Sequence, residues 1–176
     1  MIVALPLALS LACTLPGEAA AACLPGPACL EATFPGAYAW GGLTPAGGGE
    51  NLSAKQAVGV ESTDPWGVKI SSDLAHGRMT EWDGLAYVAG SPKMLASPLE
   101  WGLTRIGAVP EPAVSYSPLT GTPATIAGGQ PGTCDVTTCA IVDVGTRYRQ
   151  HVSYADEPAG AGDYRILVTF EASQGF

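Results

Sequence analysis

The stretch 147–173 constrains the fold more than any other part of the sequence, because its residues alternate with a period of two. One face of its first half carries Tyr148, Gln150, Val152 and Tyr154, and one face of its second half carries Tyr164, Ile166, Val168, Phe170 and Ala172. Such alternation, with aromatic and β-branched residues, predicts half-buried β-strands. A loop rich in Asp, Pro and Gly joins the two runs at 155–163. We therefore predict that they pair as an antiparallel hairpin in an all-β protein.

The composition favours the same class. The chain of 176 residues holds 23 glycines and 15 prolines, and 47% of its residues are hydrophobic while only 14% are charged. It is too apolar for a disordered chain and too rich in turn formers for a helical bundle. Its length suits one domain with a real core. The net charge of −8 disfavours a nucleic acid or an anionic membrane as partner.

The N-terminal residues differ from the rest of the chain. Residues 2–13 are almost wholly apolar, and a run of small residues follows at 19–22. This order is typical of a cleaved secretory signal, although the usual positive residues at its start are lacking. A transmembrane anchor needs about 20 apolar residues, which this run lacks, whereas a lipoprotein signal ending at Cys13 stays open. We predict a signal at 1–22 and a single domain at 23–176.

The secretory signal predicts that the mature protein is secreted, extracellular or attached to a bacterial cell surface, with no membrane span. Four cysteines follow the signal, namely Cys23, Cys29, Cys134 and Cys139. An even number of cysteines in an exported chain predicts two disulfides. Of the three pairings we favour Cys23–Cys29 with Cys134–Cys139, because each closes a short, turn-rich loop. A zinc site would want closer spacings, so we expect no metal and no cofactor.

Further short strands are expected along the chain. The clearest are 52–61 and 66–71, which alternate in character and flank the turn Ser62-Thr63-Asp64-Pro65, so we expect them to form a hairpin. Shorter candidates lie at 27–34, 38–43, 78–82, 85–88, 95–103, 124–127 and 139–144. About 8–10 short strands and no amphipathic helix predict an antiparallel, immunoglobulin-like β-sandwich.

Two strand motifs carry a family resemblance. One is Asp64-Pro65-Trp66-Gly67-Val68, a tryptophan followed by alternating valines, and the other is Gly162-Asp163-Tyr164 at the start of the last strand. Over about 52–172 the chain resembles secreted bacterial immunoglobulin-like surface proteins. It is similar in outline to WxL-type wall proteins, without a W-x-L tripeptide at the expected place, and to pilins that assemble by strand donation. The resemblance implies a structural or adhesive role at the cell surface, with no catalytic residues.

No residue pattern identifies a catalytic chemistry, so we expect no enzymatic activity. Motifs of serine hydrolases, zinc proteases and nucleotide-binding proteins are missing. His76 and His151 are expected at the surface. Glu81, Asp83 and Glu100 lie near tryptophans and could serve glycoside hydrolysis, but solvated acids on an outer face are the favoured interpretation.

The loop at 155–163 carries three acidic residues, Asp156, Glu157 and Asp163. Carboxylate oxygens at a turn can hold calcium. The spacing of these residues matches no defined calcium loop, so an ordinary polar hairpin loop is expected.

Three tryptophans are candidates for an exposed ligand platform: Trp40, Trp82 and Trp101. Stacked aromatic rings would bind a glycan. The alternative is that Trp101, like Trp66, fills the core between the sheets. The two cases differ in burial and in whether the rings are coplanar.

The leading functional hypothesis is an exported structural subunit of a cell-surface filament or coat. The segment 23–36 would be donated to a neighbouring subunit, with Leu30, Ala32 and Phe34 inserted into its sheet. Such self-association would give an open polymer. In the alternative, 23–36 is the first strand of its own domain, and the protein is a monomeric carbohydrate-binding or adhesion module.

Overall fold

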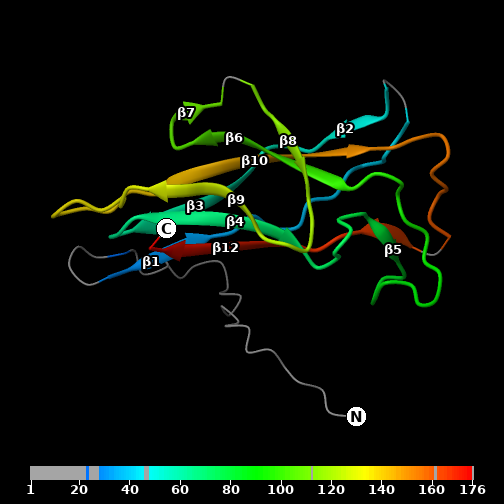
Figure 1. The fold of residues 1–176 in the computed structure, drawn as a ribbon, viewed down its shortest axis with the longest axis horizontal. Coiled ribbons are helices and arrows are strands. Elements are labelled where there is room, and N and C mark those ends of the chain that lie inside the picture. The colour runs from blue at the N-terminus through cyan, green and yellow to red at the C-terminus, as the bar shows by residue number, and fades with distance from the viewer. Residues whose placement is uncertain (1–22, 24–27, 46–47, 112, 161, 176) are drawn as a thin grey trace, which may run out of the picture.

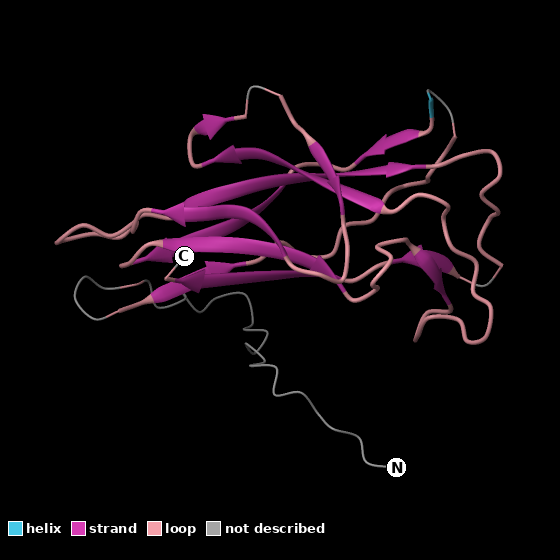
Figure 2. Ribbon diagram, in the orientation of Figure 1, coloured by secondary structure: helices cyan, strands magenta, loops and turns pink. Residues whose placement is uncertain are grey.

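The structure is a computed structural model of the chain, and it describes residues 23, 28–45, 48–111, 113–160 and 162–175. The predicted signal at 1–22 lies outside these residues. The described residues form twelve strands. They contain no helix that is long and apolar enough to cross a membrane. Figure 2 shows that strands and connecting loops make up nearly all of the described chain, which confirms the all-β class.

The largest sheet has seven antiparallel strands. Its main path runs in the order β1 (Leu30–Thr33), β3 (Gln56–Ser62), β10 (Val142–His151), β6 (Leu99–Ile106) and β7 (Val109–Pro110). Two short strands lie off this path, where β2 (Glu50–Leu52) pairs with β10 and β8 (Tyr116–Pro118) pairs with β6.

Two smaller antiparallel sheets complete the fold. One has three strands in the order β12 (Val168–Gln174), β4 (Trp66–Ser72) and β9 (Ala124–Gln130). The other pairs β11 (Asp163–Arg165) with β5 (Thr80–Trp82). In Figure 1 the β5 strand and the orange loop after β10 lie at the right end, and the yellow loop between β9 and β10 projects at the left end.

The two larger sheets share one hydrophobic core. Val58 and Val60 of β3 and Val144 of β10 are fully buried, as are Val68 and Ile70 of β4. Each strand contributes every second residue, because successive side chains point to opposite faces. Two antiparallel sheets around one core fit a β-sandwich. The immunoglobulin-like form of that sandwich stays a prediction.

Both predicted hairpins are wrong. The strand β10 pairs with β3 and β6, whereas β12 pairs with β4 in the other sheet, and the residues around Tyr164 form β11 beside β5. Similarly, β3 and β4 lie in different sheets. A period of two fixes which side chains face the core, but it does not fix the partner of a strand. In this sandwich the turns cross between the sheets.

The turn at 62–65, which carries the chain between the two sheets, is held by Ser62. This residue is fully buried, and its N–H donates to Thr133 Oγ1 at 2.9 Å. Its carbonyl oxygen accepts from the N–H of Thr133 at 2.7 Å. Its hydroxyl donates to the carbonyl oxygen of Asp64 at 2.8 Å and accepts from Gln174 Nε2 at 2.9 Å. Buried polar groups need such partners, so the turn is fixed from both sheets.

The structure contains the two favoured disulfides, Cys23–Cys29 and Cys134–Cys139. Both lie beside the same turn. The N–H of Thr63 donates to the carbonyl oxygen of Cys29 at 3.1 Å, and the N–H of Cys134 donates to that of Ser62 at 3.3 Å. The disulfides therefore reinforce the end of the sandwich where the chain changes sheet.

The proposed donor segment belongs to the chain's own sheet in this structure. The strand β1 pairs with β3, with Leu30 opposite Ser62 and Ala32 opposite Val60. Leu30 packs against the core. Phe34 is 45% exposed and stacks on Phe170 with 6.4 Å between the ring centroids. The alternative interpretation, a first strand of its own domain, describes this form of the molecule.

Candidate functional site

A groove of about 910 Å³ opens between two segments that are far apart in the sequence. One wall is the connection after β1, residues 34–45, which we call the strap. Another wall is the loop after β10, residues 152–160, which we call the rim loop, together with the chain leading into β12. Met79, Leu95 and Leu99 line the bottom. The groove therefore reaches down to the core on one side of the sandwich, within the 300–1,000 Å³ range typical of ligand sites.

The groove gathers aromatic and polar side chains. Six of the thirteen aromatic residues of the chain line it, namely Tyr38, Trp40, Tyr148, Tyr154, Tyr164 and Phe170. Its charged lining residues are Asp156, Glu157, Asp163 and Arg165. Tyr154 is 90% exposed, because it lies beyond the end of β10. An exposed ring beside fixed charges can contact both the apolar and the polar parts of a ligand.

The rim loop is fixed by hydrogen bonds from outside it. Lys93 Nζ donates to the carbonyl oxygen of Pro158 at 3.0 Å and forms an ion pair with Glu157 at 3.1 Å. The hydroxyl of Tyr164 donates to the carbonyl oxygen of Glu157 at 2.7 Å. The N–H of Gly160 donates to a carboxylate oxygen of Glu81. A loop with this many anchors presents its side chains in a defined arrangement.

Asp156 ties the rim loop to the turn before β6. One carboxylate oxygen accepts from the N–H of Ala96 and the other from the N–H of Ser153, both at 2.7 Å. Burial raises the pKa of Asp156, but the N–H groups of Ser153 and Ala96 lower it by more, so its pKa lies below the ordinary value. Asp156 is therefore a fixed carboxylate on the groove wall.

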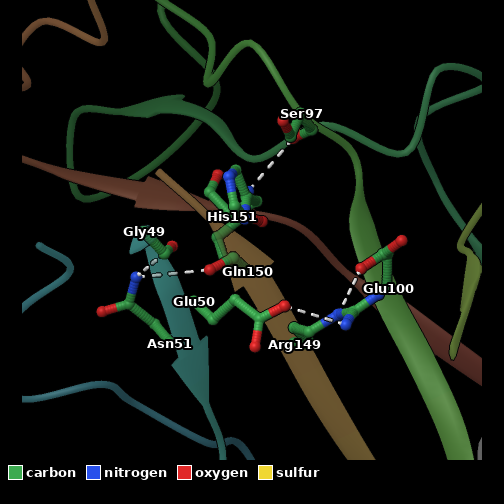
Figure 3. Close-up of polar contacts among 8 residues, drawn as sticks. All are labelled: Gly49, Glu50, Asn51, Ser97, Glu100, Arg149, Gln150 and His151. Atoms are coloured by element: carbon green, nitrogen blue, oxygen red, sulfur yellow. Dashed lines mark hydrogen bonds and ion pairs between the residues drawn. The ribbon is translucent and has the colours of Figure 1, made fainter. Parts of the chain in front are cut away.

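The far end of the strap is held by Asn51, which follows the first residue of β2. Its side-chain amide accepts from the N–H of Thr44 at 3.1 Å and donates to the carbonyl oxygen of Thr44 at 3.0 Å. It also donates to the carbonyl oxygens of Gly49 at 3.0 Å and Gln150 at 3.2 Å. Figure 3 shows these last two contacts. Asn51 thus joins the strap to β10.

Gln150 and Arg149 extend this polar cluster along β10 (Figure 3). Gln150 is fully buried, and its Nε2 donates to the carbonyl oxygen of Ser97 at 3.1 Å. Arg149 lies between two acids, with its Nε 2.6 Å from Glu100 and a terminal nitrogen 3.0 Å from Glu50. These contacts span β2, β10 and β6, so they fix the sheet beside the groove. They form a structural network, since each charged group is paired.

The three platform tryptophans do not form one surface. Trp101 is 9% exposed and belongs to the core, like Trp66. The prediction that Trp101 belongs to an exposed ligand platform is therefore wrong. Trp82 has its ring covered by Arg165, whose guanidinium carbon is 5.0 Å from the ring centroid, and it meets Tyr87 edge to face. Trp40 lines the groove and meets Tyr38 edge to face at 5.0 Å. Only Trp40 of the three therefore lies in the described groove.

The three acids considered for glycoside hydrolysis have separate structural partners. Glu81 is 6% exposed, which contradicts the expectation of a solvated acid, because it accepts backbone N–H groups of the rim loop and of Lys93. Asp83 is exposed and caps a turn through the N–H groups of Leu85 and Ala86, both at 2.8 Å. Glu100 pairs with Arg149 in another sheet. Each of the three acids therefore has a structural partner.

The remaining candidates also find separate places. His76 and His151 are both exposed, as expected. Among the described residues, Asp156, Glu157 and Asp163 do not come together as a set of metal ligands, although all three line the groove. Outside the groove, one group of three possible ligands does converge, Cys23 with Glu31 and Glu61. Its cysteine is already bonded to Cys29, so this group is a poor metal site.

Sequence reasoning missed the groove itself and two residues that shape it, Glu81 and Asn51. The groove walls are over one hundred residues apart in the sequence, so no local pattern indicates them. Comparison of the chain with protein-family models, with curated proteins and with solved structures gives no match, so no family is assigned from them.

Proposed function

We propose that this chain is an exported β-sandwich module that binds carbohydrate in the groove between the strap and the rim loop. The observation that carries the proposal is the concentration of aromatic rings and fixed charged groups in that groove. A sugar offers C–H faces, which suit the negative face of an aromatic ring, and hydroxyl groups, which need hydrogen-bond partners. The volume of the groove, about 910 Å³, lies within the range of sites that hold drug-sized ligands.

Each class of side chain has a part in this binding. Tyr154 presents an exposed ring in the groove lining, and Trp40 supplies a second aromatic surface from the strap. Asp163 accepts hydrogen bonds from hydroxyl groups, while Arg165 donates them. Carboxylates and guanidinium groups make the stronger hydrogen bonds because they are charged.

The anchored rim loop supports the proposal. Binding costs free energy whenever it orders a mobile loop. Here Asp156, Glu157 and Gly160 already have partners outside the loop. A ligand therefore meets walls that are largely in place.

A role as a structural subunit of a filament or coat remains a separate hypothesis. Its donor segment is paired with β3 of the same chain in the form described above. The groove gives the filament hypothesis no support, because the described residues of the strap form no strand that could pair with a neighbouring subunit.

The test is a screen of the mature protein on a glycan array, followed by calorimetry with the best ligand. Tyr154→Ala should weaken binding about tenfold or more, which corresponds to about 1.4 kcal/mol. Leu85→Ala is the matched control, because Leu85 is equally exposed at 90% but lies outside the groove. No binding to any glycan, or equal affinity in the two variants, would refute the proposal.

A further inference from the structure

A second feature is the way in which β1 is attached to the molecule. It is a four-residue strand at the edge of the seven-stranded sheet, and β3 is its one strand partner among the described residues. Leu30, Glu31 and Ala32 are half-buried and Thr33 is exposed. An edge strand with so little buried surface can leave its sheet at a lower cost than a central strand.

The pairing of β1 with β3 also contains an unfavourable contact. Glu31 lies directly opposite Glu61, and their carboxylate oxygens come within 4.8 Å of each other. Like charges placed opposite each other weaken an antiparallel pair. In addition, Glu31 Oε2 is buried with no hydrogen-bond partner among the described residues. Both features make it easier for β1 to detach.

The connection that follows β1 is long and rich in glycine. From Phe34 to Gly49 it has enough residues to span roughly 50 Å when extended. Gly36, Gly41 and Gly42 would each accept a Cβ with no atom within 4 Å, and none has a left-handed φ. The folded structure thus does not require glycine there, and what glycine adds is backbone freedom.

We propose that copies of this chain exchange β1, so that β1 of one copy pairs with β3 of the next while the strap extends between them. The exchanged strand keeps the register Leu30–Ser62 and Ala32–Val60, so the pairing of β1 with β3 is made again between chains. The extended strap gives up its own contacts, such as the packing of Trp40 against the core. For β1 itself such domain swapping costs little, because it replaces the contacts of the strand by identical ones. Reciprocal exchange gives a closed dimer, and one-way exchange gives an open polymer.

The repulsion between Glu31 and Glu61 is present in both forms. It therefore eases opening without favouring either the closed or the exchanged state. Cys23 and Cys29, joined by their disulfide, precede β1 and move with it, so the hydrogen bonds of Cys29 with Thr63 and Gln174 are also made again between chains.

Cross-linking between two different variants tests the exchange directly. A Cβ added at Gly59 would lie 3.9 Å from the Cβ of Thr33, within the usual range of about 3.5–4.5 Å for a disulfide. It would also meet Cγ2 of Ile141 at 3.0 Å, but that side chain is 65% exposed and can move. Thr33→Cys and Gly59→Cys are made in separate chains, which are refolded together and then oxidised mildly.

The proposal predicts a disulfide-linked pair containing one chain of each kind, seen on a non-reducing gel and identified by mass spectrometry of the joined peptides. Neither chain alone can form this bond within itself. The control pairs Thr33→Cys with Leu85→Cys, whose residue is exposed and away from β1. Monomers only, or equal yields in the control, would overturn the proposal.

Two further measurements accompany this test: one checks that the variants fold, and the other measures association of the unmodified protein. The double variant Thr33→Cys/Gly59→Cys should form the bond within one chain, which shows that both substitutions fit the fold. Sedimentation of the unmodified mature protein should reveal a dimer or larger species whose share rises with concentration, and a monomer at every concentration would contradict exchange. Glycan binding is measured on the monomer fraction, so the two proposals fail separately.

Discussion

Glu81 offers a direct test of how the groove is held, because it anchors the rim loop without itself lining the groove. It is 6% exposed and accepts N–H groups from Gly160 of the rim loop and, at 3.3 Å, from Lys93. Hydrogen bonds to a charged group contribute about 1.5–3 kcal/mol each, and the desolvation of the buried carboxylate offsets part of this. We expect Glu81→Ala to lower the free energy of unfolding by about 3 kcal/mol.

The assay combines urea unfolding with hydrogen exchange at the amide of Gly160. In Glu81→Ala this amide should exchange at least about tenfold faster, and glycan affinity should fall because the rim loop is less ordered. Glu81→Gln keeps the shape and one acceptor oxygen, so its loss of stability should be smaller. A loss below about 0.5 kcal/mol in Glu81→Ala, with unchanged exchange at Gly160, would refute this account of the rim loop.

Two further predictions concern stability away from the groove. Gly77 has a φ of +64°, and a Cβ there would lie 1.8 Å from the carbonyl oxygen of Leu119. Gly77→Ala should therefore lower the free energy of unfolding by more than the roughly 1–2 kcal/mol of a left-handed residue alone. A thermal midpoint within about 2 °C of the wild type would contradict this. The N–H groups of Thr137 and Thr138 lower the pKa of Asp135 from 3.8 to about 2. Because the folded pKa is depressed, the stabilisation is present above pH 4 or so and is lost as the pH falls toward 2. Asp135→Asn should reduce the change of the thermal midpoint with pH over that interval. A pH dependence equal to that of the wild type would show that this carboxylate does not contribute to stability.

The faces of the strands could be predicted from the sequence, whereas their partners could not. Tyr148, Gln150 and Val152 are buried together on β10 and its extension, as the alternation indicated. Tyr154, assigned to the same face, is exposed because β10 ends at His151 and the chain turns into the rim loop. Alternation predicts which side chains face the core only within a strand, and the sequence does not show clearly that β10 ends at His151.

The residues of the candidate site were harder to foresee, because they depend on contacts between distant segments. Nothing around Glu81 in the sequence indicates burial, since its partner Gly160 is 79 residues away. Trp101 and Trp40 have similar local surroundings, yet one fills the core and the other lines the groove. The short disulfide loops, by contrast, could be paired from spacing, because each is closed locally.

The most direct test of the central claim is chemical-shift mapping of the mature protein during titration with the best glycan from the array. The account predicts that amide signals of the strap and the rim loop shift together and saturate, with Tyr154 and Trp40 among the residues most affected. Signals of the turn at 62–65, at the other end of the sandwich, should stay in place. Shifts confined to that end, or none at millimolar glycan, would contradict the claim that the groove is a carbohydrate site.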